Sequence, residues 1–172
     1  MAIEMPERHP LAPKPGEEIP SHLSMCFGCG SDHPTGLHMK SIAGEGLTAS
    51  CEFTVTEMHQ GAPGLAHGGL LSLAFDEALG KLMYLLQVPA VTGHLDTDFL
   101  KPIPVGSTLF INARITGQER RKVYTEAEGR LNSPDGELAL KASALYVVVG
   151  IEHFVKNAAD GFINDKMFGI NP

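Results

Sequence analysis

Apolar residues along this chain form one long helical run, preceded and followed by runs typical of strands. Residues 70–86 carry apolar side chains over well over half of a helix circumference, which predicts a long helix buried on more than one side. Residues 47–56 alternate in part and are rich in β-branched side chains, as in a half-buried strand. Further β-rich runs follow the helix at residues 94–100, 107–118, 122–131 and 137–149.

The segments between these runs predict how the strands connect. Residues 118–121 and 132–136 have the composition of hairpin turns, so the last three strands should form an antiparallel meander. The meander must bury one face, and the almost wholly apolar helix must be covered. Both needs are met when the sheet wraps around the helix. The predicted fold class is therefore α+β, with an antiparallel sheet wrapped around one long central helix.

The chain is predicted to be a single domain with two peripheral ends. Residues 1–22 are rich in proline, which disfavours helix, so this arm is predicted to be extended or disordered and to lie outside the core. Residues 23–150 contain all the predicted elements and form the domain. Residues 151–172 follow the last apolar strand with mixed polarity and are predicted to be a peripheral tail.

Composition narrows the possible partners. A formal net charge of −7 argues against a nucleic-acid partner, because binding to phosphate backbones depends on clustered Lys and Arg. Uninterrupted apolar runs of about 18 residues are absent from the sequence, and residues 1–20 carry acidic side chains where a signal peptide would be apolar. A cytoplasmic protein without a membrane segment is expected. Three cysteines, an odd number, do not suggest a disulfide framework.

The loop that enters the predicted helix could bind an oxygen that gains negative charge. It ends in His67, Gly68 and Gly69, and the two glycines leave the backbone amides accessible. The first amides of a helix have no intrahelical acceptor, so Gly68 and Gly69 could form an oxyanion site. His67 is either a loop or cap residue or a catalyst.

Asp76 is the candidate catalytic carboxylate. The residues that share its helical stripe are small: Gly69, Ser72 and Gly80. This pattern predicts open space around Asp76, which is either satisfied by neighbouring groups or held for chemistry. Glu77 projects to another side and has Lys81 four residues later, the spacing of an ordinary surface ion pair, so a structural role is expected for Glu77.

Two segments of the chain resemble one family. The run QGAPGLAHGGLLSLAFD at residues 60–76, followed by FLKPIPVG at residues 99–106, resembles the PaaI-like hotdog-fold acyl-CoA thioesterases. The resemblance extends over residues 24–150, and its most diagnostic part is His-Gly-Gly with an acid nine positions after the His. It implies the hotdog fold, in which the sheet enfolds the helix. It also implies a homodimer or homotetramer whose active sites combine residues of two protomers.

The same resemblance implies roles for particular residues. Asp76 takes the acid position, as general base on water or as nucleophile on the thioester carbonyl. Thr92, sixteen residues later, takes the position of a residue that holds the attacking water. Gly69 takes the place of the backbone donor that polarises the thioester carbonyl, and His67 orients that end of the substrate. Many relatives carry an Asn shortly before the His; the nearest polar residue here is Gln60, seven positions upstream, in a loop that some relatives share.

The implied substrate is an acyl-CoA, and no cofactor is expected. The residues expected to contact the coenzyme A part, mostly through its anionic phosphates, are Gly68, Lys101, Arg120, Arg121 and Lys122. Medium or long acyl chains of fatty acid metabolism are expected because the helix is apolar. The depth of the acyl pocket is expected to depend on Leu73, Tyr84 and Leu85.

The segment Cys26-Phe-Gly-Cys29-Gly also resembles an opening found in a subset of these thioesterases. Tetrahedral zinc needs four ligands, and the spacing of the nearby His22, His33 and His38 fits no standard zinc site. We therefore interpret this segment as a tight turn whose amides are capped by thiols, and we expect no metal.

Two other functions stay open at this point. A hotdog-fold enoyl-thioester hydratase or dehydratase also acts on acyl thioesters, but it uses the His as its base. A non-catalytic acyl-CoA-binding protein would use the same pocket without turnover. Release of free thiol would distinguish a thioesterase from both.

Overall fold

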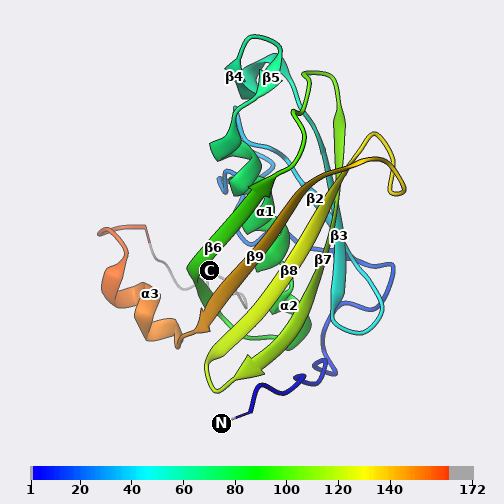
Figure 1. Cartoon of the computed structure of the whole chain (residues 1–172). Helices are drawn as coiled ribbons and strands as arrows, with labels where there is room; N and C mark the ends of the chain where they lie inside the picture. Colours follow the sequence, from blue (N-terminus) through cyan, green and yellow to red (C-terminus); the bar gives the residue numbers. More distant parts are fainter. Residues whose placement is uncertain (1, 163–172) are drawn as a thin grey trace.

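The fold is built from one large sheet and one central helix, and the computed structural model describes residues 2–162. The strands of the sheet are β1 (Glu18–Ile19), β2 (Lys40–Ala43), β3 (Thr48–Thr54), β6 (Ala90–Phe99), β7 (Thr108–Glu119), β8 (Lys122–Leu131) and β9 (Leu138–Val148). They are antiparallel and lie in the order β1-β2-β3-β7-β8-β9-β6 (Figure 1). A separate small hairpin joins β4 (Gln60–Ala62) to β5 (Leu65–Ala66). The helices are η1 (Glu57–His59), α1 (Gly68–Gly80), α2 (Met83–Leu86) and α3 (Ile151–Asn157).

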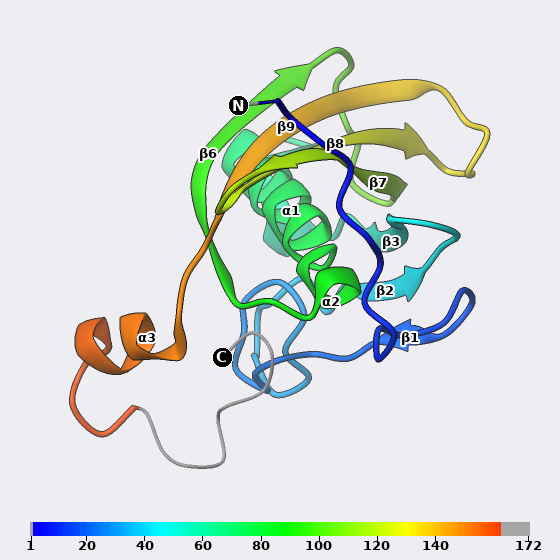
Figure 2. The same ribbon diagram turned by 90° about the horizontal axis from the view of Figure 1, so that it is seen from below.

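The curved sheet encloses α1 (Figure 2). The buried residues of α1 recur at three- and four-residue intervals: Leu71, Ala74, Phe75, Ala78 and Leu79. Alternate residues of β3, β7, β8 and β9 are buried on the inner face of the sheet, so helix and sheet bury their apolar faces in one core. The α+β architecture predicted from the sequence is therefore confirmed.

The helix differs in detail from the sequence prediction of one helix over residues 70–86. It begins two residues earlier, at Gly68, and its regular part ends at Gly80. The amide of Leu82 then donates to the carbonyl of Leu79, three residues back, and α2 continues after this tighter turn. Strand β6 likewise begins at Ala90, earlier than residue 94.

The N-terminal arm is extended, but the prediction that it lies outside the core is wrong for its last part. Glu18 and Ile19 pair with β2 at the edge of the sheet, and Ile19 is only 2% exposed. Further back, Glu4 bridges to Gln118. Proline lacks a backbone donor, so a proline-rich segment is tolerated at a sheet edge, where one side of the strand needs no partner.

The other edge of the sheet is β6, which has a neighbour on one side only. Phe99 at its end and the following Leu100 are 52% and 48% exposed, high values for large apolar side chains. Helix α3 follows β9 and has no buried residue. The remainder of the predicted tail, residues 163–172, lies outside the described residues. Over residues 2–162, none of the helices has the length and apolar character needed to cross a membrane.

Close packing between sheet and helix gives a test of this core. A Cβ added to Gly129 in β8 would lie 2.8 Å from the ring of Phe75, which is fully buried and cannot turn away. We expect Gly129→Ala to lower the free energy of unfolding by about 1–3 kcal/mol, as overpacked cores do. Denaturant unfolding measures the change.

The matched control is Gly80→Ala, the same substitution at the end of α1. Its added Cβ would make only ordinary contacts, the nearest at 3.6 Å, and alanine favours helix over glycine. Equal destabilisation by both substitutions would contradict the packing described here.

Candidate active site

Asp76 lies on α1 where the helix faces the end of the sheet formed by β6 and β9. Its side chain is partly buried, and its Oδ1 accepts two hydrogen bonds of 2.8 Å, one from the Thr92 hydroxyl and one from the Tyr146 hydroxyl. The Tyr146 hydroxyl also lies 2.8 Å from the backbone carbonyl oxygen of Asp76. Within residues 2–162 the other carboxylate oxygen, Oδ2, accepts no hydrogen bond, so it is available to a ligand.

Strand pairing explains why the two hydroxyls meet at one carboxylate. Thr92 of β6 and Tyr146 of β9 are direct partners across the two strands. The register shifts between Thr92 and His94, which marks a bulge at Gly93. Bulges turn side chains away from their regular direction and are common beside functional sites. The structure thus brings together Asp76 and Thr92, as the resemblance implies.

Tyr146 is the residue of this site that the sequence analysis missed. Its ring packs over Gly80, whose missing side chain leaves room for it, so the space predicted beside Asp76 is partly filled. The only signal in the sequence is a tyrosine within the apolar run of β9, since a buried tyrosine usually needs a hydrogen-bond acceptor. Burial and the nearby carboxylate of Asp76 raise the pKa of Tyr146 well above its usual value. The hydroxyl therefore remains a donor.

The beginning of α1 is capped by its own histidine. His67 is the N-cap residue, and its Nδ1 accepts a hydrogen bond of 2.9 Å from the amide of Gly69. The cap role left open for His67 is thus observed. In this structure the amide of Gly69 is therefore occupied by His67.

Gln60 is used within its own loop. Its Nε2 donates to the carbonyl of Glu57 at 3.0 Å, and its Oε1 accepts from the amide of Gly64 at 2.7 Å. The side chain thus links the β4–β5 hairpin to η1 and holds the hairpin turn at Gly64. The structure does not bring Gln60 into contact with Asp76 or Thr92.

An apolar pocket of about 280 Å³ lies beside the beginning of α1. Its lining includes Gly68, Leu71, Phe99, Lys101 and Ile103. A larger hollow, of about 730 Å³, lies on the outer face of the sheet among charged side chains, and its lining does not include Asp76, Thr92 or Tyr146. The smaller pocket therefore suits an apolar ligand that reaches the helix N-terminus.

The basic residues expected to contact coenzyme A do not cluster within one protomer. Lys101 donates its amide to Ala139, at the end of the sheet where β9 begins, and its ammonium pairs with Glu137 at 2.8 Å. The hairpin of Arg120, Arg121 and Lys122 lies at the opposite end, where β9 finishes.

The residues expected to set the depth of the acyl pocket differ in their burial. Tyr84 and Leu85 are buried in the core, while Leu73 is partly exposed. Of these three side chains, Leu73 is therefore the one with a surface that a ligand could reach.

Glu77 is not the surface residue predicted from its spacing. It pairs with Lys81 at 3.4 Å as expected, but only 11% of the Glu77 side chain and 2% of the Lys81 side chain are exposed. The loop at residues 20–39 covers both. Sequence spacing predicted the pair correctly and its burial wrongly, because the covering loop has no regular structure.

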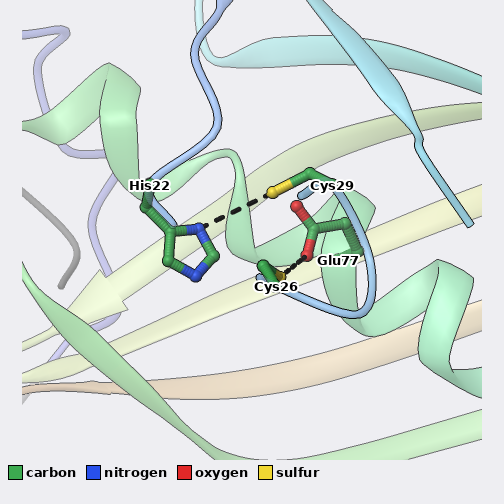
Figure 3. Close-up of side chains that lie close together, drawn as sticks. All are labelled: His22, Cys26, Cys29 and Glu77. Atoms are coloured by element: carbon green, nitrogen blue, oxygen red, sulfur yellow. Dashed lines mark hydrogen bonds between the residues drawn. The ribbon is translucent and has the colours of Figure 1, made fainter. Parts of the chain in front are cut away.

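Glu77 instead belongs to a second group of reactive side chains, with His22, Cys26 and Cys29 (Figure 3). Burial is the main cause that raises the pKa of Glu77 to about 7. A hydrogen bond from the Cys29 side chain, aided by backbone amides, lowers the pKa of Cys26 to about 6. Within the described part of the chain, these four residues, distinct from the Asp76 site, are the group that could hold a metal.

Comparison with known proteins finds similar sequences over part of this chain. The sequence model of the thioesterase superfamily matches residues 63–136. Acyl-coenzyme A thioesterase THEM4 of Xenopus laevis is 31% identical over 97 residues, which are 56% of this chain and 43% of that protein. The chain thus spans less than half the length of the curated relatives it matches.

Two solved structures show the likeness in three dimensions. A hypothetical thioesterase protein of Streptococcus pneumoniae, crystallised with coenzyme A, has a TM-score of 0.60 and 20% identity, covering 65% of this chain and 89% of that one. The E. coli PaaI protein has a TM-score of 0.59 and 22% identity, covering 64% and 83%. These likenesses confirm the hotdog fold. The pneumococcal protein has also been solved with an aspartate and, separately, a threonine sixteen residues later replaced by alanine.

The hydroxyl of Tyr146 gives a test of the site's construction. Tyr146→Phe removes the donor to Asp76 and leaves a partly buried carbonyl and carboxylate with fewer partners. We expect the free energy of unfolding to fall by about 1–3 kcal/mol. Tyr124→Phe in β8 is the matched control, because Tyr124 makes no hydrogen bond through its side chain within the described part of the chain. A loss no greater than that of the control would contradict the role given to Tyr146.

Proposed function

From the hotdog fold and the thioesterase-superfamily match over residues 63–136, we propose that this protein hydrolyses acyl-CoA thioesters to a free acid and coenzyme A. The observation that carries the proposal is the Asp76 carboxylate, whose Oδ1 accepts hydrogen bonds from two hydroxyls while Oδ2 accepts none from residues 2–162. The separation of sixteen residues between Asp76 and Thr92 equals that of the two positions replaced in the pneumococcal thioesterase. That the protein is found in the cytoplasm stays a prediction.

In the proposed reaction, Asp76 acts as general base. A water donates one hydrogen bond to Oδ2 of Asp76 and another to the hydroxyl oxygen of Thr92. Asp76 takes a proton as the water oxygen forms a bond to the thioester carbonyl carbon. The carbon–sulfur bond then breaks, the coenzyme A sulfur takes the proton from Asp76, and the acid leaves with Asp76 again a carboxylate. The general-base role is preferred over direct attack because the Thr92 hydroxyl offers the second contact that positions a water.

The helix N-terminus stabilises the oxygen that becomes negative. As the tetrahedral intermediate forms, its negatively charged oxygen accepts hydrogen bonds from the amides of Gly68 and Gly69. The His67 ring releases the hydrogen bond that it accepts from the Gly69 amide and turns to orient the thioester. Replacing one such donor typically lowers kcat by about 10²–10³-fold. Gln60 contributes by holding the loop that leads to these amides.

The acyl and coenzyme A parts are assigned to different surfaces. A medium or long acyl chain of fatty acid metabolism suits the apolar pocket at Leu71, Phe99 and Ile103. Coenzyme A phosphates would bind basic side chains. Since Lys101 and the Arg120–Lys122 hairpin lie at opposite ends of one sheet, a single coenzyme A would use both only if they come from two protomers.

An assembly of two protomers through β6 would complete the site. This strand is the edge of the sheet, carries Thr92, and ends in exposed Phe99. An edge strand has a row of backbone groups without strand partners, which favours pairing with another strand. We propose that β6 pairs with β6 of a second copy, in a homodimer or in a homotetramer built from such pairs.

Hydrogen exchange tests this assembly. In the dimer, the amides on both sides of β6 should be protected, whereas in a monomer every second amide should exchange rapidly. Strand β1, at the other edge, serves as the internal control. Light scattering should give the mass of two or four chains. A monomeric mass together with rapid exchange along the outer side of β6 would contradict the proposal.

Replacing the carboxylate tests the chemistry. Asp76→Asn keeps the shape of the side chain but cannot accept a proton, so kcat should fall by about 10²–10⁴-fold. Thiol release with a thiol-reactive dye measures the rate, across acyl-CoAs from acetyl to palmitoyl together with benzoyl- and phenylacetyl-CoA. Asp135→Asn, in the exposed β8–β9 turn, is the matched control and should retain full activity.

The same assay separates the alternatives. Binding of acyl-CoA without thiol release by folded wild-type protein would indicate a non-catalytic acyl-CoA-binding protein. Hydration of an enoyl-CoA without thiol release would indicate a hydratase or dehydratase. If Asp76→Asn lost activity only in step with its melting temperature, Asp76 would have a structural role.

A further inference from the structure

Four potential metal ligands meet where the N-terminal loop covers α1. The Nδ1 or Nε2 of His22, the sulfurs of Cys26 and Cys29, and a carboxylate oxygen of Glu77 all lie within 4.8 Å of one another. Cys26 Sγ lies 3.6 Å from Glu77 Oε2, and Cys29 Sγ lies 3.8 Å from His22 Nδ1. Figure 3 shows three of these side chains coming from the loop and Glu77 coming from the helix.

This donor set matches zinc. With metal–ligand distances of about 2.0–2.3 Å, the ligands of tetrahedral zinc lie roughly 3.3–3.8 Å apart, so no two of these ligand atoms need to move closer by more than about 1.5 Å. Thiolates, an imidazole and a carboxylate are ligands that favour Zn²⁺ over the harder Mg²⁺ and Ca²⁺. Four protein ligands fill the tetrahedron, which is typical of structural sites.

The surrounding chain holds the ligands at close quarters. Gly30 donates its amide to the carbonyl of Cys26 at 2.8 Å, forming a tight turn across the two cysteines. A Cβ at Gly28 would collide with the Glu77 carboxylate, and a Cβ at Gly30 would collide with the backbone of Ser24 and Cys26. Glycine at these two positions therefore permits the loop to approach the helix this closely.

Lys81 supplies the charge balance that a zinc ion would need. Its ammonium lies 3.3 Å from Cys29 Sγ and 3.4 Å from Glu77 Oε1, and it donates to the carbonyl of Pro20 at 2.8 Å. Two thiolates and one carboxylate carry three negative charges, Zn²⁺ carries two positive charges, and Lys81 carries the third. Buried charges are tolerated when they are compensated in this way.

We propose that His22, Cys26, Cys29 and Glu77 form a structural zinc site that attaches the N-terminal loop to α1. This replaces the expectation from sequence that the Cys-x-x-Cys segment binds no metal; Glu77, distant in the sequence, is the ligand that spacing could not supply. Residues 20–39 contain no helix or strand, so a metal would supply the cross-link that regular structure does not. The site is independent of the proposed hydrolysis.

Metal content and cobalt spectroscopy test the proposal on the full chain. Protein purified from zinc-supplemented cells without an affinity tag should contain one zinc per chain by elemental analysis. After removal of zinc by a chelator under reducing conditions, added Co²⁺ should give the visible bands of tetrahedral thiolate coordination. Adding Zn²⁺ back should raise the melting temperature and abolish those bands.

Variants assign the ligands. Cys26→Ser, Cys29→Ser and Glu77→Gln should each lower zinc content and weaken the cobalt bands. His33→Ala and Cys51→Ser are the matched controls, because neither residue belongs to the four, and both should retain one zinc per chain. Cobalt titration of the wild type gives the answer even if a ligand variant does not fold. Fully reduced wild-type protein that takes up neither Zn²⁺ nor Co²⁺ would overturn the proposal. This holds whether or not Cys26 and Cys29 had formed a disulfide before the reduction.

Discussion

The rest of the structure depends on placing two adjacent carboxylates, Asp76 and Glu77, on the one helix that the sheet encloses. A carboxylate withdrawn from water must find donors or opposite charge, or its burial costs several kcal/mol. Successive residues on a helix point about 100° apart, so no single neighbour can serve both. Each carboxylate is therefore met by a different part of the chain: Asp76 by the sheet, and Glu77 by Lys81 and the N-terminal loop.

This division fixes how α1 is rotated within the fold. The apolar stripe of α1 faces the sheet, the strands β6 and β9 provide Thr92 and Tyr146 for Asp76, and the loop at residues 20–39 covers Glu77 from outside. Rotating the helix by one residue would leave Asp76 without hydroxyl donors. The proposed chemistry and the proposed metal site therefore use adjacent residues of α1 that face different parts of the chain.

The helix and the four long strands could be predicted from the sequence, because they depend on periodicity and turn composition. The pairing of Asp76 with Thr92 was expected only from the resemblance to a known family. Tyr146 could not be predicted, since its contact with Asp76 depends on strand register and on the bulge at Gly93. The burial of Glu77 was also missed. It depends on an irregular loop whose path no repeating pattern records, and the same loop brings the cysteines to the helix.

The most direct test compares Asp76→Asn with Glu77→Gln, measuring thiol release and zinc content on the same folded samples below their melting temperatures. Separate roles for the two carboxylates predict that Asp76→Asn keeps its zinc and loses turnover. They predict that Glu77→Gln loses zinc and melts at lower temperature, while molecules that remain folded still release thiol. Loss of turnover and zinc together in both variants, or the reverse pattern, would contradict this division.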